Sequence, residues 1–250
     1  MTKRFYLIAF ISVFISLSSF GQGNWGGGVD NETLHFGFTF QYVASEYKIL
    51  KRADWKGPFP DPGGSSGSFL INDEFQSISS PVSPGFGLGF VSDLRLGNNA
   101  DLRFTPGLVF ADRLVNYEFT NPSNSVQKKV QTTLVDFPLG FKLKSDRRKN
   151  FRAYLIGGAK YSVDIVSKKK REDVALAPEA KYLKNTKSTV WYEAGIGLDL
   201  YFEFFKLSPE IKFAQSIKSV LKGNDRAENP FTAPIDKLFI RNFQFSLYFE

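Results

Sequence analysis

The final stretch of the chain, residues 239–250, alternates between apolar and polar residues. A period of two indicates a β-strand with one apolar face and one polar face. A strand this rich in aromatic residues would promote aggregation if one edge stayed free, so we expect it to pair with other strands. Its apolar parity holds Phe239, Phe243, Phe245, Leu247 and Phe249, and its polar parity holds Asn242, Gln244, Ser246 and Tyr248.

Seven earlier segments alternate in the same way, which brings the number of expected strands to eight. They cover residues 34–42, 86–96, 102–110, 135–143, 151–163, 190–202 and 207–217. The connections between them are alternately long and short. The short ones cover residues 97–100, 145–150 and 203–206, and the long ones cover residues 51–84, 120–127, 166–187 and 219–237. Short turns on one rim and long loops on the other are the plan of an outer-membrane barrel.

The sequence therefore predicts an all-β fold, an eight-stranded antiparallel transmembrane up-and-down β-barrel over residues 33–250. Short turns are expected at the periplasmic rim and longer loops outside the cell, with both termini periplasmic. The third segment is apolar up to Phe110 and turns polar at Asp112. Nine apolar-faced residues are close to the ~9–11 that a tilted strand needs to cross a bilayer. The chain from there to Phe119 is expected above the membrane.

The composition of the two strand faces indicates which one meets lipid. The chain has 27 Phe, and these residues fall mainly on one parity of the segments, opposite glycine and charged residues. An eight-stranded barrel has an interior only just wide enough to be filled by side chains. Because four or five bulky residues from every strand would overfill it, the Phe/Leu face is expected to point outward.

Charged residues of the opposite parity are then expected inside the barrel. An unpaired charge in that position would cost several kcal/mol, so the sequence predicts a structural network of ion pairs. Its predicted members are Asp93, Arg95, Arg103, Arg113, Asp136, Lys142, Lys160, Glu193, Asp199, Glu210 and Lys212.

Three prolines fall inside the predicted strands, at Pro106, Pro138 and Pro209. Each removes one backbone donor from the hydrogen-bonded ladder, and a closed barrel has no edge strand to hold it. We therefore expect β-bulges at these three positions, or a strand register that differs from the one inferred here.

The N-terminus has the pattern of a secretory signal peptide over residues 1–21. Lys3 and Arg4 precede an uncharged apolar run, and Ser19 and Gly21 are small residues suited to a cleavage site. Gln22 would then start the mature chain, with residues 22–32 as a short lead into the barrel. The alternative is an uncleaved transmembrane anchor, for which the run is short.

Residues suited to catalysis or metal binding are scarce. The chain has no Cys, which excludes disulfides and thiol catalysis, and its one histidine, His35, lacks a second His to form a metal site. His35 falls near the expected periplasmic start of the first strand, where we expect a structural role. We expect no cofactor, no metal, no small-molecule substrate and no nucleic-acid partner. The basic runs at residues 147–149 and 168–171 are expected to be solvated loops, with contact to anionic lipid headgroups as the alternative.

Several segments resemble the PorT family, also called SprT, of outer-membrane proteins. The segments are LHFGFTF at residues 34–40, PGFGLGFVSDLRL at 84–96, LRFTPGLVF at 102–110, DFPLGFKLKS at 136–145 and RAYLIGGAKYS at 152–162. The resemblance implies a component of the type IX secretion system, which exports proteins with C-terminal signals and, in some species, gliding adhesins. It implies no enzymatic activity and brings no site residues with it.

The leading hypothesis is an outer-membrane barrel required for type IX secretion, and for gliding motility where that occurs, acting through contacts with other secretion proteins and with outer-membrane lipid. Two alternatives remain. A generic small barrel could stiffen the envelope or adhere to surfaces through its loops. A barrel enzyme could modify lipid A or phospholipid, and His35 would be its only histidine.

Overall fold

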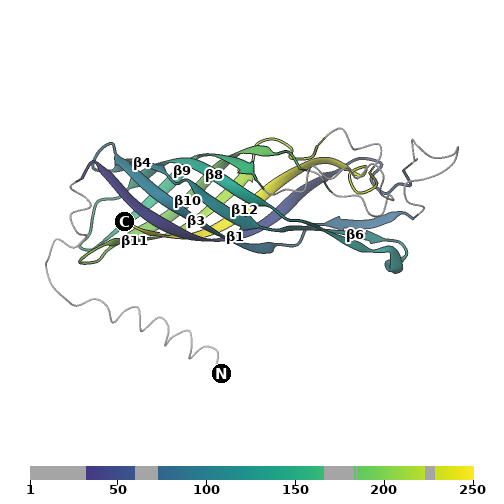
Figure 1. Ribbon diagram of the computed structural model, residues 1–250, viewed down its shortest axis with the longest axis horizontal. Helices are drawn as coiled ribbons and strands as arrows, with labels where there is room; N and C mark the ends of the chain where they lie inside the picture. Colours follow the sequence, from purple (N-terminus) through teal and green to yellow (C-terminus); the bar gives the residue numbers. More distant parts are fainter. Residues whose placement is uncertain (1–31, 60–72, 166–182, 184, 223–228) are drawn as a thin grey trace, which may run out of the picture.

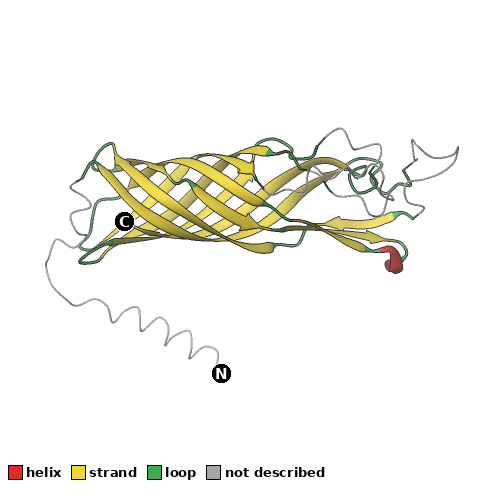
Figure 2. Ribbon diagram, in the orientation of Figure 1, coloured by secondary structure: helices red, strands yellow, loops and turns green. Residues whose placement is uncertain are grey.

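The computed structural model describes residues 32–59, 73–165, 183, 185–222 and 229–250. These residues form a closed antiparallel barrel with a smaller sheet projecting from one end (Figure 1). Strands dominate the fold, and one short 3-10 helix, Pro122–Asn124, lies at the far tip of the projection (Figure 2). The predicted signal peptide, residues 1–21, and most of the lead that follows lie outside the described residues. Within the described part, no helix has the length and apolar character needed to cross a bilayer.

Two sheets account for the strands that the structure describes. The strands are β1 (Leu34–Lys51), β2 (Phe75–Ser79), β3 (Ser83–Arg95), β4 (Ala100–Phe104), β5 (Gly107–Ala111), β6 (Arg113–Phe119), β7 (Val126–Val130), β8 (Thr133–Lys144), β9 (Phe151–Asp164), β10 (Ser188–Tyr201), β11 (Lys206–Ser216) and β12 (Ile235–Phe249).

The barrel is a ring with eight strand positions. Each strand pairs with its neighbours in chain order, and β1 closes the ring by pairing with both β12 and β3. Phe40, for example, lies opposite Leu247 on one side and Leu88 on the other. Strands β4 and β5 share one position, between β3 and β8. The eight-stranded antiparallel fold predicted from the sequence is confirmed.

Pro106 separates β4 from β5, but it does so without inserting a residue. Phe104 pairs with Leu139 and Gly107 with Asp136, so the offset between the strands is the same on both sides of the break. The offset between β10 and β11 is likewise unchanged across Pro209, and the β8–β9 ladder runs through Pro138. The prediction of bulges at the three prolines is wrong. Each proline lacks the N–H for one hydrogen bond of the ladder. The residue pairs on either side of it keep the same offset, so the strand register does not change.

The outer wall of the barrel carries the Phe/Leu face. Phe36 and Phe90 are 70% and 74% exposed, and the same parity is exposed on every strand of the ring. From Leu34 to Tyr42 the apolar band on β1 spans about 27 Å along the strand at ~3.4 Å per residue. At a tilt of about 40° this gives a height of about 21 Å, near the ~25 Å band of outer-membrane barrels. The predicted assignment of faces is confirmed.

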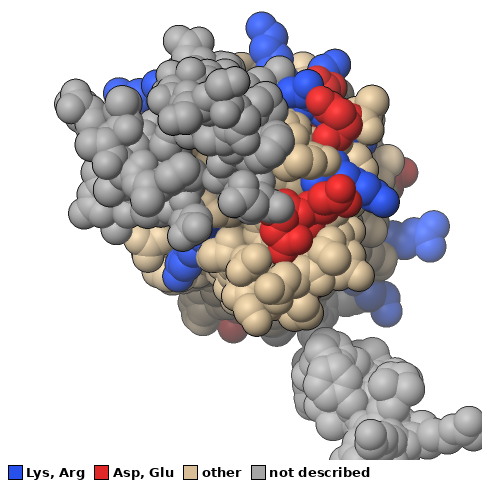
Figure 3. All heavy atoms as spheres, turned by 90° about the vertical axis from the view of Figure 1, so that its right-hand side faces the viewer, with Lys and Arg blue, Asp and Glu red and all other residues tan. Residues whose placement is uncertain are grey.

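Beyond the apolar band, the strands continue into a projection. Strands β2, β6 and β7 form a separate three-stranded sheet there, while β1 and β12 extend alongside it (Figure 2). The segment that follows Asp112 is thus strand β6, and the predicted loop of residues 120–127 contains the turn between β6 and β7 and the first two residues of β7. Acidic and basic side chains both lie on the described part of this end (Figure 3).

The C-terminus and the short turns lie at the opposite end of the barrel from the projection (Figure 1). The first described strand also starts there, since the backbone N–H of Arg95 donates to the carbonyl of Thr33, 2.8 Å away. The long connections of residues 51–84, 166–187 and 219–237 all depart from the projecting end, and each includes residues outside the described part of the chain.

Candidate functional site

Arg103 of β4 is the centre of a charged cluster inside the barrel. Its guanidinium forms two 2.7 Å hydrogen bonds with the carboxylate of Asp93 on β3. It also lies 3.3 Å from Glu210 of β11 and 2.8 Å from Glu250. Because the side chain of Arg103 is only 1% exposed, it bridges three buried carboxylates across the lumen. Strand β11 does not pair with β3 or β4, so it is the closed ring that brings Glu210 to Arg103.

Lysines continue the cluster along the lumen. Lys142 lies 2.8 Å from Asp199 and 3.8 Å from Asp93. Nearer the projecting end, Lys160 lies 3.1 Å from Asp136 and 3.3 Å from Glu193.

Lys212 links the two levels, at 3.1 Å from Glu210 and 3.8 Å from Glu193. The ion pairs therefore form one continuous chain through the part of the barrel that carries the apolar band. Nine of the eleven predicted residues take part in it.

Two tyrosines fill the remaining space around Glu210. The hydroxyls of Tyr154 and Tyr248 each donate to a different oxygen of its carboxylate, both at 3.0 Å. The Arg103 guanidinium carbon lies 4.3 Å from the centre of the Tyr248 ring. Aromatic rings and charges thus pack together, and the lumen at this level is occupied by side chains.

Arg95 and Arg113 lie at the two ends of the lumen. Arg95 lies at the rim, where it donates to the carbonyl of Gly97 and the side chain of Asn98 in the short turn. Arg113 is buried, but it donates to the hydroxyls of Ser45 and Thr132. Arg113 begins β6, just where the strand leaves the ring, so its neighbours are hydroxyls of the barrel mouth.

Several members of the network are not among the residues predicted from the sequence. Glu250 also pairs with Lys206, and Lys144 lies 2.7 Å from Asp101. Glu250 shares the even parity of Ser246 and Tyr248, so extending the alternation by one residue would have placed it inside. Lys206 was assigned to a turn, but it is the first residue of β11.

His35 is buried in β1, opposite Asp93 in the register with β3. It lies at the end of the barrel that holds the C-terminus. Among the described residues, no group of three or more His, Cys, Asp or Glu side chains is arranged to hold a metal ion.

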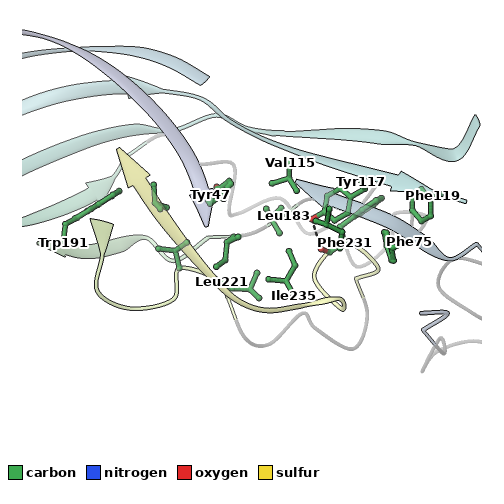
Figure 4. Close-up of a cluster of buried hydrophobic side chains, with 14 of the residues drawn as sticks. Tyr47, Phe75, Val115, Tyr117, Phe119, Leu183, Trp191, Leu221, Phe231 and Ile235 are labelled. Atoms are coloured by element: carbon green, nitrogen blue, oxygen red, sulfur yellow. Dashed lines mark hydrogen bonds between the residues drawn. The ribbon is translucent and has the colours of Figure 1, made fainter. Parts of the chain in front are cut away.

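Above the ion pairs, an apolar cap closes the lumen at the projecting end. Its members come from six strands and from the connections between them (Figure 4). They are Tyr47, Phe75, Ile78, Val115, Tyr117, Phe119, Leu183, Trp191, Ala214, Val220, Leu221, Phe231, Ile235, Leu238 and Ile240. The cap and the ion pairs meet where the Lys160 ammonium lies 4.7 Å from the centre of the Trp191 ring.

Tyr117 is a central member of the cap. It is fully buried, and its ring lies 5.0 Å from that of Phe231 and 5.9 Å from that of Phe75. Its hydroxyl donates to the carbonyl of Phe231, 2.8 Å away (Figure 4). Burial raises the pKa of this phenol. It therefore stays neutral and keeps its proton for that hydrogen bond.

The sequence carries a signal for the cap. Along β1, the outward parity changes from apolar to charged at Glu46 and Lys48, while the inward parity becomes apolar at Tyr47 and Ile49. This reversal marks the point where a strand leaves lipid, because its outer face then meets water and its inner face must pack.

Ion conductance should be absent from the purified barrel in planar lipid bilayers. The cap and the ion pairs fill successive levels of the lumen, so no continuous water path is expected for hydrated ions. Single-channel recording over a range of voltages is the measurement. Reproducible conductance steps of one size would contradict the filled lumen.

The family model described as "Outer membrane protein beta-barrel domain" matches residues 31–222. The chain belongs to this family. The protein is therefore a small outer-membrane β-barrel. Membership is at this broad level, and the resemblance to the PorT family stays a prediction.

Three solved structures illustrate the likeness in fold. OprG from Pseudomonas aeruginosa is 10% identical, with a TM-score of 0.41 over 86% of this chain and 92% of that one. AlkL, solved in DMPC bilayers, is 14% identical, with a TM-score of 0.35 over 93% and 92%. Ail of Yersinia pestis, solved with the heparin analogue sucrose octasulfate, is 10% identical, with a TM-score of 0.33 over 86% and 96%. A search of curated proteins found no match.

Proposed function

We propose that this barrel supports type IX protein secretion through contacts with other secretion proteins. The observation that carries the proposal is the filled lumen, with Arg103 bridging three carboxylates below and the apolar cap above. A barrel filled in this way has no room for a cargo protein, so its rims and outer wall are the surfaces left for a function. The pathway itself comes from the resemblance of segments such as residues 84–96 and 152–162 to the PorT family.

In this proposal the C-terminal end of the barrel faces the periplasm and the projection faces outward. Short turns such as residues 97–100 at one end and long connections at the other support that orientation. The signal peptide of residues 1–21 would deliver the chain to the envelope and be removed. Partner proteins would then meet the short turns from the periplasm or the projection from outside.

Deleting the gene should trap cargo proteins with C-terminal secretion signals inside the cell envelope. Immunoblots of culture medium and periplasm measure this, and the wild-type gene supplied on a plasmid should restore secretion. Periplasmic proteins without the signal provide the control, because their location should not change. Normal cargo secretion in the deletion strain would contradict the proposal.

A structural or adhesive role is the second candidate, and the projection favours it. Strands β2, β6 and β7 raise a folded sheet beyond the apolar band, where it can meet a surface. This role predicts intact secretion in the deletion strain, together with altered adhesion or envelope integrity.

We further propose that the barrel acts without catalysis. His35 lies inside the wall at the C-terminal end, away from the mouth that an outer-leaflet lipid would approach. A lipid-modifying enzyme would instead change the lipid mass spectrum of the deletion strain and would lose that effect in His35→Ala.

A further inference from the structure

A groove of about 690 Å³ lies in the outer wall of the barrel, toward the C-terminal end. Strands β8 to β12 contribute to it, through residues that include Leu143, Ala153, Leu198, Pro209 and Phe245. Its size is within the range of about 300–1,000 Å³ that is typical of ligand sites. Because its outward-facing residues lie on the lipid-facing wall, its occupant must come from the membrane.

The sheet register explains why the wall is hollow there. Leu155, Ile196, Ile211 and Phe245 lie opposite one another on successive strands and form a row of large side chains. The next row toward the rim contains two smaller outward residues, Ala153 and Pro209, on either side of Leu198.

A third row, at the rim, is large again, with Phe151 opposite Leu200 and Leu207 opposite Phe249. The groove therefore lies between two apolar ridges, with Leu198 between its two smaller residues. A depression of this shape can accept a flexible hydrocarbon chain.

The mouth of the groove is basic. Ser145 lines it, and the turn that starts there carries Arg147, Arg148 and Lys149 in succession. Arg148 and Lys149 are exposed.

The turn itself is held in a defined shape. The Nε of Arg147 donates to the carbonyl of Lys149, 2.8 Å away, and the guanidinium of Arg147 lies 3.9 Å from the Tyr201 ring centre. The neighbouring acid, Asp146, accepts a hydrogen bond from Asn99. Arg148 and Lys149 are thus presented on an ordered turn, where an anionic headgroup can reach them.

We propose that this groove and turn bind one anionic glycerophospholipid, with an acyl chain between the ridges and the phosphate at residues 147–149. The pairing of an apolar slot with a cationic end matches the two parts of such a lipid, and each cation near an anionic membrane surface strengthens binding. With the C-terminal end toward the periplasm, the lipid belongs to the inner leaflet. The site goes beyond the secretion role and rests only on the orientation proposed with it.

Native mass spectrometry of the full-length barrel, extracted from outer membranes and titrated with single lipids, tests the site. Phosphatidylglycerol should bind about tenfold or more tightly than phosphatidylcholine with the same acyl chains, because only the former has a net negative headgroup. The charge variant Arg147→Gln/Arg148→Gln/Lys149→Asn should abolish that preference. Asparagine is chosen at residue 149 because Lys149 has φ +55°, which Asn tolerates.

Two matched controls separate the site from general effects. Lys218→Gln/Lys222→Gln/Lys237→Gln also removes three cations, all from the projecting end, and should keep the preference. Ala153→Trp fills the groove and should weaken binding of both lipids. Ala159→Trp, on the same strand at an exposed position outside the groove, should leave binding unchanged.

Heat-modifiable mobility on gels confirms that each variant is folded before titration. Equal affinity of the wild type for the two phospholipids would overturn the proposal, as would equal losses in the two charge variants. Preferential binding of lipopolysaccharide would also overturn it, because that lipid belongs to the other leaflet. A failed secretion assay would leave these binding results unaffected, so the two proposals can fail separately.

Discussion

Arg103→Met should destabilise the barrel by about 3–5 kcal/mol, the range observed when one partner of a buried ion pair is removed. Asp93, Glu210 and Glu250 would all lose the guanidinium that now contacts them. Burial leaves little access for water to replace it. The free energy of unfolding in lipid vesicles, from urea titration followed by tryptophan fluorescence, measures the loss.

Two comparisons make that measurement specific. Adding Asp93→Asn to Arg103→Met removes one of the carboxylates left without the guanidinium, and the double variant should recover part of the stability. Arg52→Met breaks an exposed pair with Asp54 and should cost no more than about 0.5 kcal/mol. If Arg103→Met proved as stable as Arg52→Met, the charged cluster would contribute no net stability.

Tyr117→Ala should open the apolar cap while leaving the lipid-spanning barrel closed. Truncation of a buried aromatic residue costs about 3–5 kcal/mol. Tyr117 packs between Phe75 and Phe231, beyond the apolar band, so the loss is expected to fall locally. Hydrogen exchange by mass spectrometry should show faster exchange in β6 and in residues 229–240, with β9 and β10 still protected.

Tyr117→Phe and Tyr161→Ala are the matched variants. The first keeps the ring and loses only the hydrogen bond to the Phe231 carbonyl, for a cost of about 1 kcal/mol. The second removes a tyrosine from the lipid-facing wall, where Tyr161 is 46% exposed, and should leave exchange in the cap unchanged. Equal exchange in Tyr117→Ala and the wild type would show that the cap does not depend on this residue.

Strand pattern and face were predictable because they depend on local periodicity. The alternation of Phe36, Phe38 and Phe40 with polar neighbours is visible over a few residues, and the pleat of one strand turns it into two faces. Eight such segments, joined by alternately long and short connections, were enough to predict the closed ring. The same parity placed Arg103 and Lys142 inside, before any partner was known.

The prolines show where local rules were insufficient. Pro106 was expected to force a bulge, but the neighbouring strands on both sides hold the register through Phe104 and Gly107. The pairing energy of many flanking residues outweighs the loss of one backbone donor. That total depends on the partner strands, so it cannot be read from the residues around the proline alone. The surroundings of Arg113 were missed for a related reason, since β6 leaves the ring at that residue.

The sequence by itself determined that this chain is an eight-stranded barrel with an apolar outer wall and a charged interior, because a period of two repeats along each strand. The tertiary structure decided which charges meet, how the cap is assembled and where the wall is hollow. Arg103 and Glu250 are 147 positions apart, and Ala153 and Pro209 share one row only because Leu198 of β10 lies between them. Such contacts depend on closure and register, which are properties of all the strands together.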